Sequence, residues 1–331
     1  MAEGDPILAV LGELVVDLLP LVDEAAPTTA PRYVARPGGN ALNVAVAAGR
    51  LGAPVALLAR LGTGPMAAAL RRHAEASGVD VRPMVAAGEP VSLAVVGLDE
   101  HGSPDYGFHV AGAADWQWTD AELETALPDA TAILHVGSIS SWTPPGSDAI
   151  ARLVERAAGR VLVSVDPNIR PMLTEGPVGT LLGNDADGVR ARLQRLLDAA
   201  DVVKVSAEDL DWLVPGADLD DVASAWAARG PALVLVTDGG RPLRVARPAR
   251  AVARVEVPAV GVVDTVGAGD TLAAALLAGL LRAGVRTRPA LDAVPTDDLL
   301  DLVSEAALAS ALNCTRAGAD PPTRAELDAA R

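Results

Sequence analysis

The sequence has 331 residues, 50% of them apolar, and a formal net charge of −16. A chain of this length can bury a large core, but its acidity argues against nucleic acid or an anionic membrane as a partner, because both require basic surfaces. Lys204 is the only lysine, and no Gly-x-x-x-x-Gly-Lys-[Ser/Thr] element occurs, which excludes a P-loop mechanism. Any phosphate must therefore be bound by backbone amides, arginines and a metal ion.

The cysteines, the histidines and the N-terminal segment exclude further classes of protein and site. Cys314 is the only cysteine, which rules out an intramolecular disulfide and fits a reducing compartment. The apolar run near the N-terminus lacks a preceding basic segment and is interrupted by Glu13 and Asp17, so we expect neither a signal peptide nor a membrane span. The four histidines show no metal-ligand spacing, which argues against a structural zinc. These features predict a cytoplasmic protein.

The first predicted element is a buried strand over residues 7–16, which ends at Asp17. A carboxylate just beyond the carboxyl end of a parallel strand lies where open α/β sheets contact their ligands. Asp17 is therefore a candidate ligand contact, and a solvated loop acid is the alternative interpretation. We expect residues 28–35 to form a short extended segment before the next motif.

That motif is the glycine pair Gly38-Gly39, followed by an alanine-rich segment over residues 40–52. Paired glycines permit the backbone to approach a ligand closely, and the small side chains that follow suit a helix packed tightly on a sheet. Asn43 either contacts the ligand or is an ordinary helix residue. Residues 55–60 and 65–77 then predict a strand and a helix.

Three short β-like runs follow over residues 81–85, 91–98 and 106–110, with no helix between them. In a chain that otherwise alternates strands and helices, such a meander predicts a small β appendage. Phe108, the only phenylalanine, lies in the last run. It either packs within the appendage or faces the ligand, and we favour the ligand side.

Strands and helices alternate through the rest of the chain, which predicts an α/β fold with a doubly wound, mainly parallel sheet and helices on both faces. Several of these strands end in polar or glycine-rich stretches. They are Asp166-Pro167-Asn168-Ile169-Arg170, Ser206-Ala207-Glu208-Asp209 and Thr237-Asp238-Gly239-Gly240. The second stretch also has the composition of a helix start, with a Ser cap and acids in the first turn.

A glycine-rich stretch, Val263-Asp264-Thr265-Val266-Gly267-Ala268-Gly269-Asp270-Thr271, runs directly into an apolar segment of helical length. Its small residues leave the amides of a tight turn uncovered, and a helix that starts near Gly269 adds the positive end of its dipole. Amides that converge in this way bind phosphate or a developing anion. Asp270, in the first turn, either caps the helix or accepts a proton from a hydroxyl group.

Residues 264–270 resemble the second signature of the ribokinase-like (PfkB) family of carbohydrate kinases, and residues 38–43 resemble its first signature, Gly-Gly-x-x-x-Asn. The Asp-Pro-Asn-x-Arg stretch is similar to the fructokinase branch of that family. Thr271 and Leu272 depart from the small residue and Phe that usually follow the second signature, which affects helix packing more than chemistry. The resemblance covers nearly the whole chain. It implies a single ribokinase-like domain over residues 1–331, with lid segments near residues 17–36 and 81–112.

The resemblance also implies roles for individual residues. Asp270 would be the catalytic base, and the amides of Gly267, Ala268 and Gly269 would stabilise the transferring phosphoryl group. The implied sugar contacts are Asp17, Gly38, Gly39, Asn43, Phe108, Arg170 and Asp270. The implied nucleotide contacts are Asn168, Lys204, Ser206, Thr237, Gly239, Gly267, Gly269 and Asn313.

The metal motif of the family is Asn-x-x-Glu, which organises magnesium through water. In this chain Ser206 and Asp209 are in register with the motif, and Glu208 is adjacent. Magnesium binds oxygen ligands and retains several waters, so a shorter carboxylate can act through an extra water, and we favour Asp209 over Glu208. Some relatives hold a potassium ion beside the residue that matches Asp264, and the sequence leaves this point open. The match to the nucleotide loop of the family, Thr-x-Gly-x-x-Gly, is imperfect at positions 238 and 241.

Together these features predict an ATP-dependent sugar kinase that uses Mg2+ and is most like a fructokinase. A family kinase for 2-keto-3-deoxygluconate, ribose or a nucleoside is the nearest alternative. A non-catalytic regulatory protein that binds sugar or nucleotide is the alternative of a different class, and the presence of Asp270 argues against it. A dinucleotide-dependent dehydrogenase is disfavoured because no Gly-x-Gly-x-x-Gly follows the first strand. The expected partners are a small sugar and ATP, and the sequence leaves open which sugar is used and whether a homodimer forms through the lid.

Overall fold

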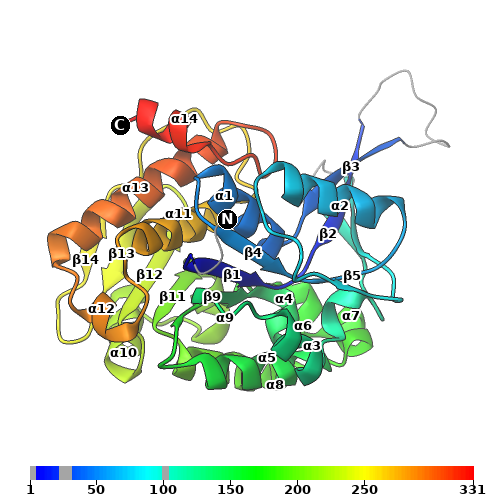
Figure 1. The fold of residues 1–331 in the computed structure, drawn as a ribbon, viewed down its shortest axis with the longest axis horizontal. Helices are drawn as coiled ribbons and strands as arrows, with labels where there is room; N and C mark the ends of the chain where they lie inside the picture. Colours follow the sequence, from blue (N-terminus) through cyan, green and yellow to red (C-terminus); the bar gives the residue numbers. More distant parts are fainter. Residues whose placement is uncertain (1–4, 22–31, 99–103) are drawn as a thin grey trace.

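The structure is a computed structural model that describes residues 5–21, 32–98 and 104–331. Within these residues the central sheet has eight strands. They are β1 (Ile7–Leu11), β4 (Val55–Leu58), β9 (Thr131–Gly137), β10 (Leu162–Asp166), β11 (Val202–Ser206), β12 (Leu233–Asp238), β13 (Arg241–Ala246) and β14 (Ala253–Val255). The order across the sheet is β14-β13-β12-β11-β10-β9-β1-β4, and the strands from β12 to β4 run parallel, while β13 and β14 form an antiparallel edge (Figure 1).

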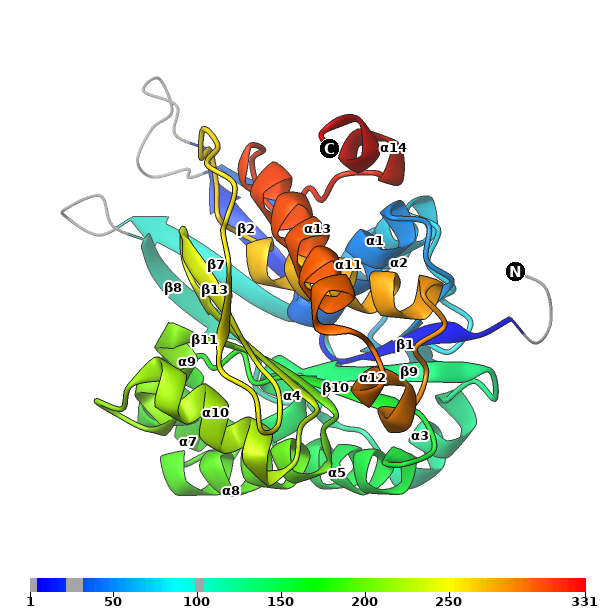
Figure 2. The same cartoon turned by 90° about the vertical axis from the view of Figure 1, so that its left-hand side faces the viewer.

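Helices cover both faces of this sheet, as Figure 2 shows. One face carries α1 (Asn40–Arg50), α2 (Pro65–Ala76), α11 (Ala268–Arg282) and α13 (Thr296–Cys314). The other face carries α3 (Asp120–Ala126), α5 (Gly146–Ala157), α8 (Ala186–Ala199) and α10 (Leu219–Arg229). The parallel strands are apolar and buried almost throughout, as expected for strands covered on both sides. The predicted doubly wound, mainly parallel sheet is confirmed.

Shorter helices complete the architecture around the edges of the sheet. They are η1 (Ala114–Trp116), α4 (Ser138–Trp142), α6 (Pro171–Thr174), α7 (Gly176–Leu182), α9 (Ala207–Leu213), α12 (Arg288–Asp292) and α14 (Arg324–Ala329). Helix α9 follows β11 directly, and Ser206 is its N-cap, so the prediction that residues 206–209 start a helix is confirmed. The C-terminal α14 lies on the α1 side of the sheet, above α13 in Figure 1.

A second sheet, with four strands among the described residues in the order β3-β2-β7-β8, projects from one side of the molecule (Figure 2). Its strands are β2 (Val15–Pro20), β3 (Tyr33–Gly38), β7 (Ser92–Leu98) and β8 (Pro104–His109). Strand β2 pairs antiparallel with β3 and parallel with β7. We call this the lid sheet, and its closure over a bound sugar stays a prediction.

The prediction of one strand over residues 7–16 is wrong, because the structure divides this stretch between two sheets. The chain leaves the central sheet after β1, where a Cβ at Gly12 would lie only 2.8 Å from Cβ of Ala41. The next residue, Glu13, is buried, and its carboxylate accepts hydrogen bonds from the backbone N–H groups of Asn40 and Ser140. Asp17 therefore lies within strand β2 of the lid sheet and not beyond the end of a core strand.

Residues 81–84 form no strand, contrary to the prediction for residues 81–85. Asp80 accepts a hydrogen bond from the backbone N–H of Arg82, which turns the chain at this point. The strand that follows, β6 (Val85–Ala86), pairs with β5 (Arg60–Leu61) in a separate two-stranded sheet and does not belong to the lid sheet. Of the extended segment expected at residues 28–35, residues 28–31 lie outside the described part of the chain, and β3 includes the end of the segment.

Helix α11 is the most deeply placed helix around the candidate site. It is buried from Asp270 to Leu281 and packs against α1 and α13 as well as against β1 and β9. A helix that is apolar on all sides needs such surroundings. Its N-terminal turn, which carries Asp270, consequently lies against the N-terminal half of α1.

Candidate functional site

Asp270 contacts helix α1 through both carboxylate oxygens. It is 8% exposed, and its Oδ1 accepts a hydrogen bond from Nδ2 of Asn40 at 2.7 Å. Its Oδ2 accepts a hydrogen bond from Nδ2 of Asn43 at 2.8 Å. The N-cap of α11 is Gly267, and no side chain in the described part of the chain caps this helix. Asp270 is thus directed across to the neighbouring helix and does not serve as the cap that was the alternative interpretation.

The glycine-rich turn before Asp270 is shaped by close contacts that exclude larger residues. Gly267 has φ +74°, and a Cβ there would lie 2.7 Å from Cβ of Ala319. A Cβ at Gly269 would lie 2.7 Å from Nζ of Lys204. The amide of Ala268 donates to the carbonyl of Thr265 at 3.2 Å, within the turn. The three amides expected to stabilise a phosphoryl group are therefore not equivalent, since the amide of Ala268 already has an acceptor.

Two polar side chains hold this turn in place from outside. Asp264 accepts hydrogen bonds from the backbone N–H groups of Val266 at 3.0 Å and Gly318 at 2.8 Å. Asn313, which is fully buried on α13, donates from Nδ2 to the carbonyl of Val266 at 2.8 Å. Asp264 and Asn313 thereby fix the turn, and the predicted contacts with a potassium ion and the nucleotide stay predictions.

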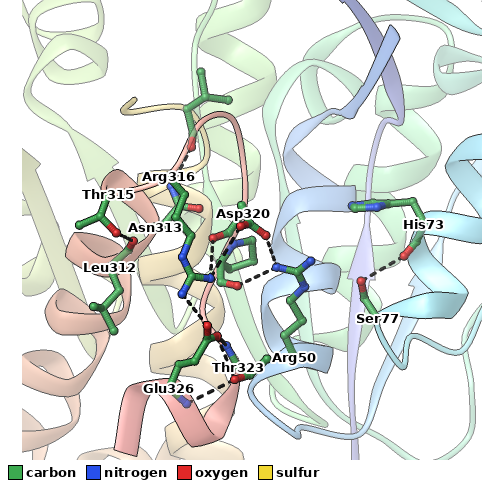
Figure 3. Close-up of polar contacts among 12 residues, drawn as sticks. Arg50, His73, Ser77, Leu312, Asn313, Thr315, Arg316, Asp320, Thr323 and Glu326 are labelled. Atoms are coloured by element: carbon green, nitrogen blue, oxygen red, sulfur yellow. Dashed lines mark hydrogen bonds and ion pairs between the residues drawn. The ribbon is translucent and has the colours of Figure 1, made fainter. Parts of the chain in front are cut away.

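The loop that supports the turn is itself tied to α1 and α14 (Figure 3). Arg50 of α1 forms an ion pair with Asp320 and donates to the carbonyl of Pro321 at 2.8 Å. Arg316 lies on the opposite side of Asp320 in Figure 3 and donates to Glu326 at 2.7 Å. Residues 316–326 therefore connect the loop beside the glycine-rich turn to helix α1.

A buried cluster of charge lies beneath the turn, at the carboxyl ends of β10 and β11. Nζ of Lys204 is 3.0 Å from Oδ2 of Asp166, and Oδ1 of Asp166 is buried without a hydrogen-bond partner among the described residues. Burial raises the pKa of Asp166 to about 6, and the Lys204 ammonium opposes this rise. Burial acts to lower the pKa of Lys204, but the carboxylates of Asp166, Asp209 and Asp270 outweigh burial and raise it. The lysine therefore remains an ammonium group at neutral pH.

Asp209 connects this cluster to the loop after β10. Its Oδ2 accepts from the backbone N–H of Ser206 at 3.0 Å and from the Ser206 hydroxyl at 2.7 Å, which completes a capping box for α9. Its Oδ1 accepts from the backbone N–H of Ile169 at 2.7 Å. Asp209 is buried, whereas Glu208 is exposed. The helix therefore presents Asp209 toward the site, on the side that we favoured for a metal contact.

The loop after β10 has the unusual backbone expected of a binding segment. Asn168 has a positive φ of 40°, a conformation that few residues other than glycine adopt without strain. The hydrogen bond from the neighbouring Ile169 to Asp209 holds this conformation. Thr237 lies nearby, because β11 and β12 pair Ser206 with Thr237, and Gly239 follows in the β12–β13 turn. Four of the predicted nucleotide residues thus lie at the carboxyl ends of the neighbouring strands β10, β11 and β12, namely Asn168, Ser206, Thr237 and Gly239.

Two of the predicted sugar residues, Asp17 and Phe108, lie in one row across the strands of the lid sheet. Asp17 pairs with Ala94, and Ala94 pairs with Phe108, so the side chains of Asp17 and Phe108 project from the same face. A Cβ at Gly38 would collide with the Asp17 carboxylate, which explains the need for glycine there. Burial raises the pKa of Asp17 to about 6, opposed by the nearby positive charge of Arg170. The lid sheet thereby presents an aromatic and an acidic side chain on one face, and their contact with a sugar stays a prediction.

Three residues of this site were not predicted from the sequence. Asn40 and Asn43 are three positions apart, so they lie on the same face of a helix, and this spacing could have indicated that both contact the same group. Asp166 begins the Asp-Pro-Asn-x-Arg stretch and ends a strand, as a ligand contact would. Glu13 gave no signal beyond interrupting an apolar run. All three are buried, which the sequence alone did not indicate.

No group of three or more His, Cys, Asp or Glu side chains in residues 5–21, 32–98 and 104–331 has the arrangement of a metal site. Within the same described segments, no helix is long and apolar enough to cross a membrane.

Comparison with known proteins extends these observations to nearly the whole chain. Residues 6–326 match a family model described as pfkB family carbohydrate kinase. A fructokinase of Rhizobium leguminosarum bv. trifolii is 35% identical over 271 residues, which cover 81% of this chain and 78% of that protein. A fructokinase of Klebsiella pneumoniae is 36% identical over 281 residues, with coverages of 83% and 85%.

Solved structures show the same similarity at the level of the fold. The crystal structure of fructokinase with bound ATP from Xylella fastidiosa has a TM-score of 0.85 and 28% identity, and covers 99% of this chain and 98% of that chain. A fructokinase double mutant from Vibrio cholerae O395, bound to fructose, ADP and a potassium ion, has a TM-score of 0.80 and 28% identity, with 99% of both chains covered.

Proposed function

Because this chain belongs to the pfkB family of carbohydrate kinases, we propose that it transfers the γ-phosphate of ATP to a hydroxymethyl oxygen of fructose. The observation that carries this proposal is the position of Asp270, a buried carboxylate in the first turn of α11, directly after the glycine-rich turn. A base and an anion site are thus adjacent, which is the arrangement that phosphoryl transfer to an alcohol requires. The fructokinase relatives support fructose as the sugar.

In the proposed reaction the sugar oxygen attacks the γ-phosphorus while Asp270 accepts the hydroxyl proton. The new O–P bond forms as the bond from the γ-phosphorus to the β,γ-bridging oxygen of ATP breaks, and ADP leaves. The dipole of α11 and the amides of Gly267 and Gly269 would stabilise the negative charge on the transferring group. Ala268 would contribute less, because its amide donates to Thr265.

Sugar recognition would involve residues from both sheets. Asp17 and Phe108 share one face of the lid sheet, and Arg170 is close enough to Asp17 to lower its pKa against the effect of burial. Asn43 would hydrogen-bond a sugar hydroxyl beside Asp270, and the absence of a side chain at Gly38 leaves room for Asp17. These contacts combine hydrogen bonds to hydroxyl groups with an apolar surface for the sugar ring.

The residues beneath the turn fit a magnesium ion that retains its waters. Oδ1 of Asp166 is buried and has no partner in the described residues, so it can accept a hydrogen bond from a metal-bound water. Asp209 lies beside it, although its oxygens also accept backbone hydrogen bonds, and Glu208 is exposed. Magnesium would supply charge neutralisation at the β- and γ-phosphates. Asp264, at the turn, is the residue beside which a potassium ion would bind.

An assay of ADP release over a panel of sugars tests this proposal. Fructose should give the highest kcat/KM among fructose, ribose, 2-keto-3-deoxygluconate and a nucleoside. A higher value for another member would replace fructose as the substrate, and no sugar-dependent release would favour the non-catalytic alternative. Asp270→Asn is the matched control, since it should bind sugar and ATP but lose about 10²–10⁴-fold in kcat.

The proposal includes a cytoplasmic location and a homodimer formed through the lid sheet. The exposed side chains of Leu21 and Tyr33, which lie at the outer end of this sheet, support an interface there. Light scattering of the wild type and of Tyr33→Asp would test it. A dimer unaffected by Tyr33→Asp, or a wild-type monomer, would contradict this part of the proposal.

A further inference from the structure

We propose that Asn40 is a positioning residue for Asp270. Asn40 holds Oδ1 of the Asp270 carboxylate and leaves Oδ2 as the atom that accepts the proton. This inference rests on the proposed kinase function, in which Asp270 is the base. Asn40 occupies an unspecified position of the Gly-Gly-x-x-x-Asn pattern, so the pattern itself gives it no role. Its role follows from three features of its surroundings.

The first feature is the difference in burial between the two hydrogen bonds to Asp270. The Asn40 bond to Oδ1 is buried, and Asn40 is 5% exposed. The Asn43 bond to Oδ2 is only partly buried, and Asn43 is half-buried. A sugar hydroxyl that arrives from solvent can therefore replace the Asn43 bond at Oδ2, while the Asn40 bond at Oδ1 remains behind it.

The second feature is the way in which the backbone of Asn40 is fixed. Its N–H donates to Oε1 of Glu13 at 3.4 Å, and Oε2 of Glu13 accepts from the N–H of Ser140 at 3.2 Å. Glu13 is 1% exposed and lies between β1 and the lid strand β2. The start of α1 is thus attached to α4 and to the root of the lid sheet through one buried carboxylate.

The third feature is the orientation of the Asn40 amide. A carboxylate accepts but cannot donate, so the amide must present Nδ2 to Asp270 and turn Oδ1 away. That oxygen is buried and has no hydrogen-bond partner in the described part of the chain. A Cβ at Gly137 would lie 3.3 Å from it, which shows how closely the glycine backbone approaches. Asp270, and not a partner of the amide oxygen, therefore determines how Asn40 is oriented.

These features make Asn40 important for turnover more than for sugar affinity. A misplacement of about 1 Å at a reacting group lowers a rate by about 100-fold. We expect Asn40→Ala to lower kcat by about 10- to 100-fold and to change the KM for the sugar by less than about threefold. A residue that bound the sugar directly would instead raise KM.

A double-mutant cycle separates a role through Asp270 from a general structural role. The rates of wild type, Asn40→Ala, Asp270→Asn and the double variant are compared on the sugar with the highest wild-type rate. We expect Asn40→Ala to change the residual rate of Asp270→Asn by less than about threefold, because its effect in the wild type acts through the base. An equal fold-loss in both backgrounds, a large rise in KM or an unchanged kcat would overturn the inference.

Two further variants keep the test decisive. Asn184 is another buried asparagine, bonded to Leu173 and Thr143 far from Asp270 in the chain, so Asn184→Ala controls for the loss of a buried amide and should keep the wild-type kcat. Asn40→Ser, which keeps a polar group at the helix start but is too short to reach Asp270, replaces Asn40→Ala if that variant does not fold. A wild-type protein without sugar-dependent ADP release would overturn the proposed function itself, and the inference with it.

Discussion

The ammonium nitrogen of Lys204 lies 3.0 Å from Oδ2 of Asp166, where the two side chains are 7% and 0% exposed. The chain contains no other lysine, and all its remaining basic side chains apart from histidine are arginines. The compact ammonium group fits directly beneath Gly269, where the larger planar guanidinium of arginine would not. This ion pair therefore joins β10 to β11 directly beneath the turn that precedes Asp270.

We expect Lys204→Met to destabilise the protein strongly. Removal of the ammonium group leaves Asp166 buried without its partner, and breaking a buried ion pair lowers the free energy of unfolding by about 3–5 kcal/mol. Urea denaturation followed by circular dichroism would measure the change. The further substitution Asp166→Asn should recover part of the loss, because it removes the uncompensated charge.

The control for this experiment is Arg152→Met, which breaks the exposed pair between Arg152 and Asp120. Its urea midpoint should equal that of the wild type within error, because exposed pairs contribute little. A Lys204→Met variant as stable as this control would show that the buried pair is not a structural element.

We expect the Asp17 carboxylate to lower the stability of the folded protein at neutral pH but to strengthen sugar binding. Burial raises its pKa from 3.8 to about 6, so the folded protein holds the proton more tightly than the unfolded chain does. Its contribution therefore lowers the free energy of unfolding as the pH rises from 3.8 to about 6, and the full loss persists above that range. Asp17→Asn should accordingly raise Tm at pH 7 and have a much smaller effect near pH 3.8, as measured by calorimetry.

The same variant should bind the sugar more weakly. Loss of a buried polar contact reduces binding by about 1–3 kcal/mol, so kcat/KM for fructose should fall while the affinity for ATP is retained. An equal loss of ATP affinity would point to a defect of the fold, and a lower Tm at pH 7 would contradict the assigned effect of burial.

The two outer glycines of the turn should respond differently to substitution by alanine. Gly267→Ala places a side chain at a φ of +74° and against Ala319, where the backbone adds about 1–2 kcal/mol of strain. Gly269→Ala directs its new methyl group at Nζ of Lys204, the end of a flexible side chain, which can shift without leaving Asp166. We expect both variants to lose kcat, with the larger loss of Tm in Gly267→Ala.

Gly261→Ala is the matched control, because a Cβ at that position meets no atom of residues 5–21, 32–98 and 104–331 within 4 Å and the residue lies in the same segment. It should retain the wild-type kcat and Tm. If Gly267→Ala behaved like this control in both measurements, the close contact with Ala319 would not constrain the turn.

Asp209 and Glu208 should be distinguishable by a magnesium titration. Asp209 is buried beside Asp166, and Glu208 is exposed, so Asp209→Asn should raise the magnesium concentration needed for half-maximal rate. Glu208→Gln should leave that concentration unchanged. The reverse pattern would assign the metal side of α9 to Glu208.

Much of this protein could be predicted from local sequence. Continuous apolar runs specify buried parallel strands, and their alternation with helices specifies a doubly wound sheet, because each pattern has only one way to bury its surface. The anion site in the turn before Asp270 was also predicted from local sequence, because closely spaced glycines before an apolar helix leave backbone amides uncovered. Asp270 was predicted on this basis, the family resemblance added Asn43, and a hydrogen bond joins the two side chains in the structure.

The tertiary structure alone decided which side chains share the site. Residues 7–16 have one apolar pattern, yet the contact of Gly12 with α1 and the buried bonds of Glu13 divide them between two sheets, and this places Asp17 in the lid sheet. The hydrogen bond from Asn40 to Asp270 spans 230 positions in the chain. Local sequence encodes the period and the length of an element, but a contact across such a distance depends on how helices pack on the sheet, so only the folded chain shows it.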